Sequence, residues 1–337
     1  MSPIATALPR FRSRLRFAVV LAATALAVSS ARAQETIKIG YLHQIHDAAI
    51  MSVEKELGSK YKLEMIKFLR YADTELALSR GDLDVATLGY TNGIIAAGRE
   101  AAPSFTYVAG LSRGAINVVC AKDVKVGGWN DLKGKKFGIL AGGTAELFFD
   151  DALSAHGISR KDIPAVTFTA PGPPLLQALQ NKDIDCTAVF EPFAANAVAT
   201  GHGYYPAAID LAQNSFRGVN SAWAANNAFL KRNPAFVKDA VGVIVKASAY
   251  YEAHKDKLQT DFPKRLEFKP EVIKIGADKI ILDSNLYFAS AVKTAEAMKR
   301  LGFIKDVPAN AKLAAYFDYG MLTGVTGKSA DDVGRNK

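Results

Sequence analysis

The fold is decided by the stretch Ala77-Leu-Ser-Arg-Gly-Asp-Leu-Asp-Val-Ala86, which recurs as Ala178-Leu-Gln-Asn-Lys-Asp-Ile-Asp-Cys-Thr187. Each copy reads as a helix end, a tight turn, an Asp-x-Asp pair and the start of a buried strand. Upstream of each copy, Lys38-Ile-Gly-Tyr-Leu42 is echoed by Lys136-Phe-Gly-Ile-Leu140. Two copies about a hundred residues apart are too few and too long for a repeat array. The sequence therefore predicts two similar α/β lobes.

Strands and helices alternate outward from the first copy. Strands are expected at 36–42, 63–68 and 83–88, separated by a helix that ends near Leu57 and a helix that Asp73 caps. This order is typical of a mostly parallel sheet. The later chain is expected to form helices at 234–251, 270–274 and 286–301 that pack back on the first lobe. Crossings within 107–119 and 216–225 would give a first lobe of 34–112 and 218–337 and a second lobe of 113–217.

Residues 1–33 differ in kind from the rest. Arginines from Arg10 to Arg16 precede an apolar run from Phe17 to Val28, and Ala31-Arg-Ala33 matches a cleavage site before Gln34. The run is shorter than the roughly 20 residues that span a bilayer as a helix. We therefore expect a cleaved Sec signal peptide and a soluble periplasmic protein. No cysteine follows the cleavage site to carry a lipid anchor.

The composition excludes several classes of protein. Of 337 residues, 49% are hydrophobic and 22% are charged, which excludes a disordered or fibrous chain. The formal charge of +9 includes five arginines within 1–33, so 37 basic residues face 33 acidic ones in the remainder. No basic stretch interleaved with aromatics is present, so no nucleic-acid partner is expected. Two cysteines are too few for a disulfide scaffold or a four-cysteine zinc module.

The order and spacing of several motifs resemble a known family. They are Ile37-Lys-Ile-Gly-Tyr41, the run from Ala77 to Gly89, Asp131-Leu-Lys-Gly-Lys-Lys-Phe-Gly-Ile139, Gly142-Gly143-Thr144 and Phe190-Glu191-Pro192. Together they are similar to the periplasmic substrate-binding proteins of ABC importers for nitrate, sulfonate and taurine, the NMT1/THI5-like group. The resemblance covers nearly all of 37–301. It implies a type II two-lobed fold with two crossovers, whose cleft closes on a small molecule and delivers it to a membrane permease.

The chain departs from the family pattern where the ligand would lie. His43, Gln44 and His46 follow the first strand, where small residues are frequent, and Arg70-Tyr71-Ala72-Asp73 replaces a Gly/Ser-rich turn after the second. These departures favour a wider ligand with more hydrogen-bonding groups than nitrate. Binders of pyrimidine precursors and of aromatic acids belong to the same family.

Ligands of open α/β sheets bind outside the carboxyl ends of the strands, and this rule selects the candidate site. The first lobe contributes His43, Gln44, His46, Tyr71, Gly89, Tyr90 and Thr91, and the second lobe contributes Gly142, Gly143, Thr144, Ala145 and Glu191. Arg113 in the first crossing and Trp223 beyond the second complete the set.

The turn Gly142-Gly143-Thr144 is the strongest candidate on physical grounds. Glycines let backbone N–H groups approach a ligand oxygen, a helix N-terminus supplies partial positive charge, and Thr144 supplies a hydroxyl. The plainer alternative is an ordinary strand-to-helix turn with Thr144 as its N-cap.

The other candidates each have a structural alternative. His43 and His46 suit hydrogen bonds to an anion better than metal ligation, because no third and fourth ligands are indicated. Tyr71 and Tyr90 could stack on a ligand or belong to the core. Arg113 could pair with an anion or a surface carboxylate. Glu191 suits a ligand amine, or alternatively caps the next helix, and Trp223 covers the ligand or packs under the hinge.

The paired aspartates and the two cysteines are expected to have structural roles. Asp82, Asp84, Asp183 and Asp185 are expected to be turn and cap residues because they repeat at the same place in both copies. Cys120 and Cys186 are expected to be buried free thiols, with a disulfide as the alternative that an oxidising periplasm allows.

The sequence thus predicts a monomeric solute-binding protein for a small organic anion, sulfonate- or taurine-like or an aromatic or amino acid. It predicts no catalysis and no cofactor. The alternatives are a pyrimidine-precursor binder, a sensor subunit or an enzyme of the same fold. Against an enzyme, no nucleophile with an adjacent base and no P-loop is present.

Overall fold

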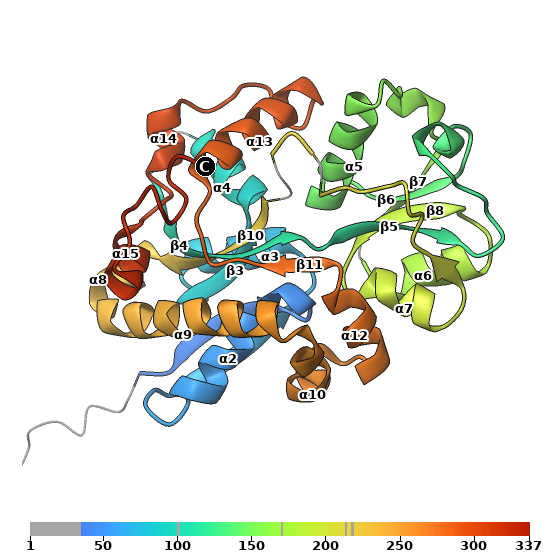
Figure 1. Ribbon diagram of the computed structural model, residues 1–337. Helices are drawn as coiled ribbons and strands as arrows, with labels where there is room; N and C mark the ends of the chain where they lie inside the picture. The colour runs from blue at the N-terminus through green and yellow to red at the C-terminus, as the bar shows by residue number, and fades with distance from the viewer. Residues whose placement is uncertain (1–34, 100–101, 170, 213, 217–218) are drawn as a thin grey trace, which may run out of the picture. The chain divides into compact units, whose positions relative to one another are not determined.

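The computed structural model describes residues 35–99, 102–169, 171–212, 214–216 and 219–337 (Figure 1). The chain divides into two units, Met1–Thr36 and Ile37–Lys337. The expected signal peptide, residues 1–33, lies outside the described residues. All the helices and strands of the described residues belong to the second unit, which contains two sheets.

The first sheet has six strands in the order β11-β4-β10-β3-β1-β2. As expected, β1, β2 and β3 run parallel, whereas β10 is antiparallel to β3 and β4, and β11 is antiparallel to β4. The bounds are β1 Ile37–Leu42, β2 Leu63–Phe68, β3 Val85–Gly89, β4 Phe105–Gly114, β10 Val219–Asn226 and β11 Ile280–Leu282.

The second sheet repeats this plan with five strands in the order β7-β6-β8-β5-β9. Here β6 runs parallel to β7 and β8, and β5 is antiparallel to β8 and β9. The bounds are β5 Ile116–Ala121, β6 Phe137–Leu140, β7 Ala165–Phe168, β8 Cys186–Phe190 and β9 Gly203–Tyr204. In both sheets the first strand of the copy lies between the other two parallel strands.

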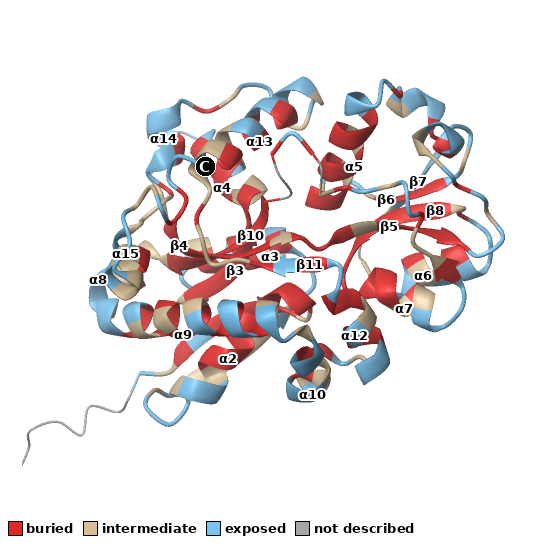
Figure 2. Cartoon of the chain, viewed as in Figure 1, coloured by how far each residue is buried: buried red, intermediate tan, exposed pale blue. Residues whose placement is uncertain are grey.

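Helices cover both sheets, and their buried sides face the strands (Figures 1 and 2). On the first sheet, α2 packs with α9 on one face and α4 packs with α13 on the other. The bounds are α2 Ala48–Leu57, α3 Tyr71–Arg80, α4 Tyr90–Ala97, α5 Thr144–Ala155, α6 Pro173–Gln180, α7 Phe193–Ala199, α8 Asn227–Arg232, α9 Pro234–Ala253, α10 Leu258–Asp261, α11 Pro263–Leu266, α12 Pro270–Ala277, α13 Phe288–Arg300, α14 Asn310–Ala314 and α15 Gly320–Thr326, with short 3-10 turns η1 Ile45–Asp47, η2 Trp129–Leu132, η3 Arg160–Asp162 and η4 Lys255–Lys257.

In both copies of the repeated motif, an aspartate side chain accepts a hydrogen bond from a backbone N–H at the equivalent position. The Asp84 carboxylate accepts a hydrogen bond from the Lys38 N–H at 2.9 Å, and Asp185 accepts one from Lys136 N–H at 2.7 Å. Each aspartate therefore joins the start of the middle one of the three parallel strands in its sheet to the strand that follows the turn. This confirms the structural interpretation of Asp84 and Asp185.

The helix α3 begins earlier than the sequence suggested. It starts at Tyr71 with Arg70 as N-cap, and Asp73 lies inside the first turn. The Asp73 carboxylate accepts two hydrogen bonds from the Arg70 guanidinium, at 2.9 and 2.7 Å, so it does not cap the helix as expected. The Asp73 carboxylate bonds to the Arg70 side chain instead of to the N–H groups at the start of α3.

The chain crosses between the sheets where β4 runs into β5. Only Ala115, with φ of 66°, separates the two strands, and β4 extends two residues past the expected boundary at 112/113. The expected return boundary at 217/218 lies outside the described residues. Although most of the C-terminal helices pack on the first sheet, α12 packs on α7 beside the second.

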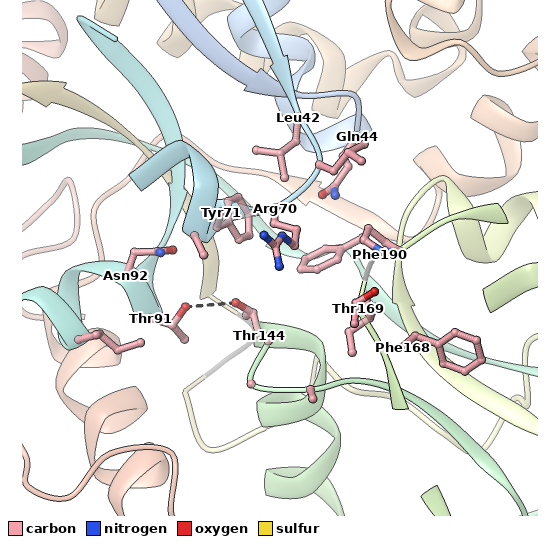
Figure 3. Close-up of a pocket in the computed structure, with 18 residues that line it drawn as sticks. Leu42, Gln44, Arg70, Tyr71, Thr91, Asn92, Thr144, Phe168, Thr169 and Phe190 are labelled. Carbon is pink, nitrogen blue, oxygen red and sulfur yellow. Dashed lines mark hydrogen bonds between the residues drawn. The ribbon is translucent and has the colours of Figure 1, made fainter. Parts of the chain in front are cut away.

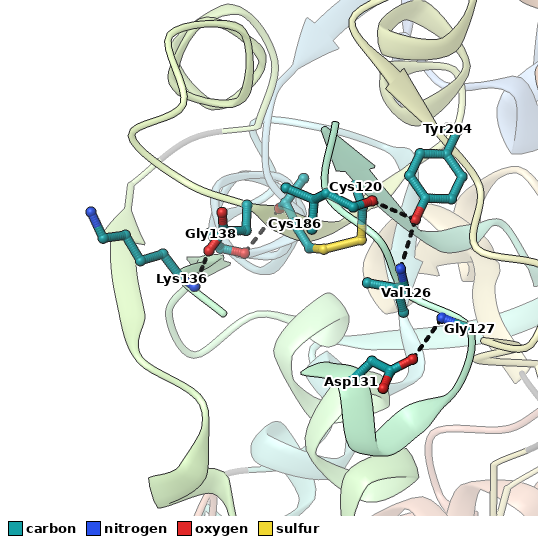
Figure 4. The surroundings of a disulfide bond; sticks show 11 residues. Cys120, Val126, Gly127, Asp131, Lys136, Gly138, Cys186 and Tyr204 are labelled. Atoms are coloured by element: carbon teal, nitrogen blue, oxygen red, sulfur yellow. Dashed lines mark hydrogen bonds between the residues drawn. A yellow bond between two sulfur atoms is a disulfide. The ribbon is translucent and has the colours of Figure 1, made fainter. Parts of the chain in front are cut away.

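The expectation of free thiols was wrong. Cys120 on β5 and Cys186 on β8 are directly opposite each other in the antiparallel pair and form a disulfide (Figure 4). Directly opposed residues of neighbouring strands have their side chains close together, so the strand register brought the sulfurs into bonding range. The sequence placed both residues in strands but could not give that register.

Within the described residues, no helix is both long enough and apolar enough to cross a membrane.

Candidate functional site

A cavity of about 200 Å³ lies at the carboxyl ends of the parallel strands of both sheets (Figure 3). Its lining combines apolar side chains with hydroxyls, amides and a single charged residue. The lining residues are Leu42, Gln44, Leu69, Arg70, Tyr71, Ala72, Thr91, Asn92, Ile95, Leu140, Ala141, Gly142, Gly143, Thr144, Phe168, Thr169, Pro171 and Phe190. The cavity therefore lies where the rule of binding at strand ends predicts a ligand site, and residues of both lobes line it.

Three helices begin at the cavity. Their N-caps are Arg70 for α3, Gly89 for α4 and Gly143 for α5, and none of these caps supplies a side-chain hydrogen bond to its helix. The first turns of these helices, at Tyr71, Thr91 and Thr144, line the cavity. The Asn92 side chain accepts from the Gly89 N–H at 3.2 Å, and Asp73 and Glu146 lie in the first turns of α3 and α5. Helix N-termini carry partial positive charge, and the convergence of three of them favours an anionic ligand.

Arg70 is the charged residue of the lining. Its Nε and Nη2 atoms donate to Asp73, and its side chain remains half-exposed. A guanidinium has five N–H donors, so the pair with Asp73 fixes its direction and leaves further donors for a ligand. In Figure 3 the guanidinium projects into the same space as the Phe190 ring.

The glycine turn contributes differently from the expectation. The Gly142 N–H donates to Oε2 of Glu146 at 2.6 Å, and the Gly143 N–H donates to the Leu140 carbonyl at 3.1 Å. Both glycine N–H groups thus have partners within the chain. The part of this turn that faces the other lobe is the Thr144 hydroxyl, which lies 3.2 Å from the Thr91 hydroxyl (Figure 3).

Gln44 and Tyr71 form the wall contributed by β1 and α3. The Gln44 side chain is buried, and none of the described residues bonds to its Oε1. The Tyr71 hydroxyl lies 2.8 Å from Nε2 of His46, which is buried behind the lining. Burial lowers the pKa of His46 to about 3, so this imidazole is neutral and orients Tyr71.

Asp47 lies in the same buried layer and was missed by sequence reasoning. It accepts hydrogen bonds from the Leu42 N–H at 2.5 Å and the Thr87 hydroxyl at 2.9 Å. Burial raises the pKa of Asp47 to about 8, against the opposing effect of these two donors. A carboxyl with a pKa raised this far is mostly protonated at pH 7, so Asp47 and the neutral imidazole place little charge under the cavity.

Several predicted residues do not line the cavity. His43 lies between the rings of Phe193 and Phe268, and burial lowers its pKa. Arg113 donates to Asp283 at 3.0 Å, which is the surface pairing left open above. Gly89, Tyr90, Ala145 and Trp223 are buried outside the lining.

Glu191 is buried outside the cavity lining, and its carboxylate is held by hydrogen bonds. Its carboxylate accepts hydrogen bonds from Asn117 Nδ2 at 2.9 Å, the Tyr205 hydroxyl at 2.9 Å and the Ala195 N–H at 3.0 Å. The last bond caps the first turn of α7, as the structural alternative held. Burial raises the pKa of Glu191 to about 7, and the three donors oppose that rise.

The residues that sequence reasoning missed follow the same rule that found the others. Phe168 ends β7 and Thr169 follows it, Arg70 follows β2, and Asn92 lies one residue beyond Thr91. The strand β7 was not predicted, so the positions after it were not considered. In the part of the chain that the structure describes, no group of three or more His, Cys, Asp or Glu residues could hold a metal ion.

The chain belongs to the NMT1-like family, whose sequence profile matches residues 30–261. A Brucella abortus protein that is named as a binding protein is 26% identical over 233 residues, which cover 66% of this chain and 68% of that protein.

Two solved structures share the fold. One is the ligand-binding component of an ABC-type import system from Staphylococcus aureus, with zinc bound, at a TM-score of 0.74 and 18% identity over 88% of this chain and all of that one. The other is the periplasmic nitrate-binding protein NrtA from Synechocystis, at a TM-score of 0.70 and 17% identity over 89% of this chain and 91% of that one. The type II two-lobed fold implied by the motifs is confirmed, and both proteins are named as binding proteins.

Proposed function

We propose that this chain is the periplasmic solute-binding component of an ABC importer, which captures a small organic anion and delivers it to a membrane permease. Family membership and the fold support the binding role. The anionic ligand is inferred from the site itself, because three helices begin at one cavity whose charged residue is Arg70.

Closure of the two lobes is part of this function. The Ile45 N–H donates to the Glu191 carbonyl at 3.4 Å, and Arg300 on α13 pairs with Asp151 on α5. These contacts and the Thr91–Thr144 contact join elements of the two sheets around the cavity. A ligand that touches both lobes favours this closed arrangement over an open one.

A thermal-shift screen of residues 34–337 tests the proposal. Sulfonates, aromatic carboxylates, nitrate, amino acids and pyrimidines are added in turn, because a ligand of the folded state raises the midpoint by mass action. A concentration-dependent rise with organic anions is the expected result. No rise with any anion would overturn the anion assignment.

Arg70→Gln tests the site. The expected result is about 10- to 100-fold weaker anion binding, as for the loss of one charge-assisted hydrogen bond, with an unchanged midpoint of the free protein. Arg335→Gln is the matched control, because Arg335 also pairs with an aspartate of its own segment and is 54% exposed against 53% for Arg70. Equal affinities of both variants, measured by titration calorimetry, would remove Arg70 from the site.

Gly143→Leu provides a second variant on the opposite lobe. A Cβ at this position would lie 3.1 Å from the Leu140 carbonyl oxygen, and the longer side chain has the adjoining cavity to fill. We expect loss of ligand binding from a folded protein, which circular dichroism and calorimetry would show together.

A further inference from the structure

We infer that the cavity selects organic monoanions with an apolar body and rejects counterparts that carry an ammonium group. The inference rests on the proposed function and narrows the ligand of that same site. It separates alternatives that the sequence left open, since sulfonates, aromatic acids, taurine-like compounds and amino acids were all compatible with the motifs.

The first observation is the charge of the lining. Among the described residues that line the cavity, Arg70 carries a charge and no carboxylate is present. An ammonium group brought into this space would face a guanidinium and three helix N-termini, all of which repel a cation.

The second observation is that the nearby acids are already bonded elsewhere. Asp73 accepts from Arg70, Glu146 accepts from the Gly142 N–H, and Glu191 accepts from three donors outside the lining. Glu191 was the one carboxylate whose place in the sequence suited a ligand amine. None of these three carboxylates is among the described residues that line the cavity, so an ammonium ion inside it would have no carboxylate in direct contact.

The third observation concerns size and apolar surface. About 200 Å³ corresponds to about seven water molecules at roughly 30 Å³ each, which is more than an inorganic anion of four atoms fills. Leu42, Leu140, Phe168, Pro171 and Phe190 supply apolar surface beside the polar groups. The apolar part of an organic anion would displace water from these side chains, whereas nitrate is too small to cover them and they would remain hydrated.

Matched ligand pairs test the inference on the unchanged protein. Calorimetry compares 1-propanesulfonate with 3-aminopropane-1-sulfonate, and benzoate with 4-(aminomethyl)benzoate. The uncharged 4-(hydroxymethyl)benzoate controls for added size and polarity. We expect each ammonium compound to bind about 100-fold more weakly than its partner, because an unpaired charge in a closed cavity costs more than an unpaired neutral group.

The outcomes separate this inference from the proposed function. Equal affinity within both pairs would overturn the selectivity and leave the anion-binding function standing. Failure of every anion in the set and in the wider screen would overturn the function. Equal weakening by the hydroxymethyl and aminomethyl groups would show exclusion by size, which also contradicts a charge-based selection.

A variant sharpens the test from the protein's side. Gln44→Glu adds a carboxylate to the lining at nearly constant size, and Figure 3 shows the Gln44 amide directed toward the cavity. We expect it to reduce the preference against ammonium at least about tenfold, the change that one gained ion pair of 1.4 kcal/mol produces. Gln44→Met, of similar size without charge, should retain the preference, and identical preferences in both variants would contradict the inference.

Discussion

The two lobes have the same frame but present different chemistry at the cleft. In the first lobe, Tyr90 follows the third parallel strand, Arg70 follows the second, and buried His46 follows the first. The corresponding strands of the second lobe are followed by Glu191, the uncharged Thr169 and the glycine turn at 142–143. The frame is set by residues that repeat, such as Asp84 and Asp185, whereas the ligand chemistry is set by the residues directly after the strands, which do not repeat.

The lobes also differ in how they are stabilised. The first sheet has six strands and most of the C-terminal helices, whereas the smaller second sheet has a disulfide between two neighbouring strands. A smaller core supplies less burial per residue, and a covalent link adds stability to the lobe with fewer strands.

Removing the disulfide should produce the largest change. For the double variant Cys120→Ala/Cys186→Ala, closing a loop of 66 residues predicts a loss of about 4 kcal/mol in the free energy of unfolding, mostly through the unfolded chain. Urea unfolding checks this value. Ligand affinity should persist in the folded variant, because Cys186 begins β8 and the cavity lies at the other end of that strand. A loss under about 1 kcal/mol would show that the link adds little to this lobe.

Glu191 should make the free energy of unfolding depend on pH, whereas its counterpart in the first lobe, Tyr90, should not. Because the folded pKa of Glu191 is raised to about 7 from 4.5, its contribution is greatest below pH 4.5 and falls as the pH rises to 7. The contribution of Glu191 to this decline should be about 3 kcal/mol, and the decline should be smaller by that amount in Glu191→Gln, while the contribution of buried Asp47 remains.

Tyr90→Phe is the control for this experiment. Burial raises the pKa of Tyr90 well above 10, so the phenol does not titrate between pH 4.5 and 7. This variant should lose the hydrogen bond from the Tyr287 N–H and keep the pH slope of the parent protein. The same slope in Glu191→Gln and its parent would show that Glu191 is not the titrating group.

The smallest effect tests the shared frame. A Cβ on Gly40 would lie 2.5 Å from Leu83 Cδ1, and one on Gly138 would lie 2.6 Å from Ile184 Cδ1. Gly40→Ala and Gly138→Ala should each cost about 1–3 kcal/mol by overpacking. Thermal unfolding should show similar losses for both and almost none for Gly128→Ala, whose Cβ would meet no atom within 4 Å. A clear loss for only one of these two variants would show that β1 and β6 pack differently against Leu83 and Ile184.

Much of the fold and part of the site followed from the sequence. The motif repeat predicted two α/β lobes, and the strand-end rule placed Gln44, Tyr71, Thr91 and the 142–144 turn, all of which line the cavity. The same rule also selected Tyr90 and Glu191, which turn into the core. A residue after a strand can face the ligand or the interior, and packing of the next helix decides between them.

The sequence by itself determined the two-lobed α/β frame, because the pattern of helix, turn, Asp-x-Asp and strand depends on the spacing of apolar residues and on turn residues within short segments. Only the tertiary structure decided the charge of the cavity and the pairing of the cysteines. Those depend on which side chains meet across lobes and strands: Asp73 turns to Arg70, Glu191 turns to Asn117 and Tyr205, and Cys120 meets Cys186. Such contacts join residues far apart in the chain, or select one of several local partners, and a single sequence does not specify them.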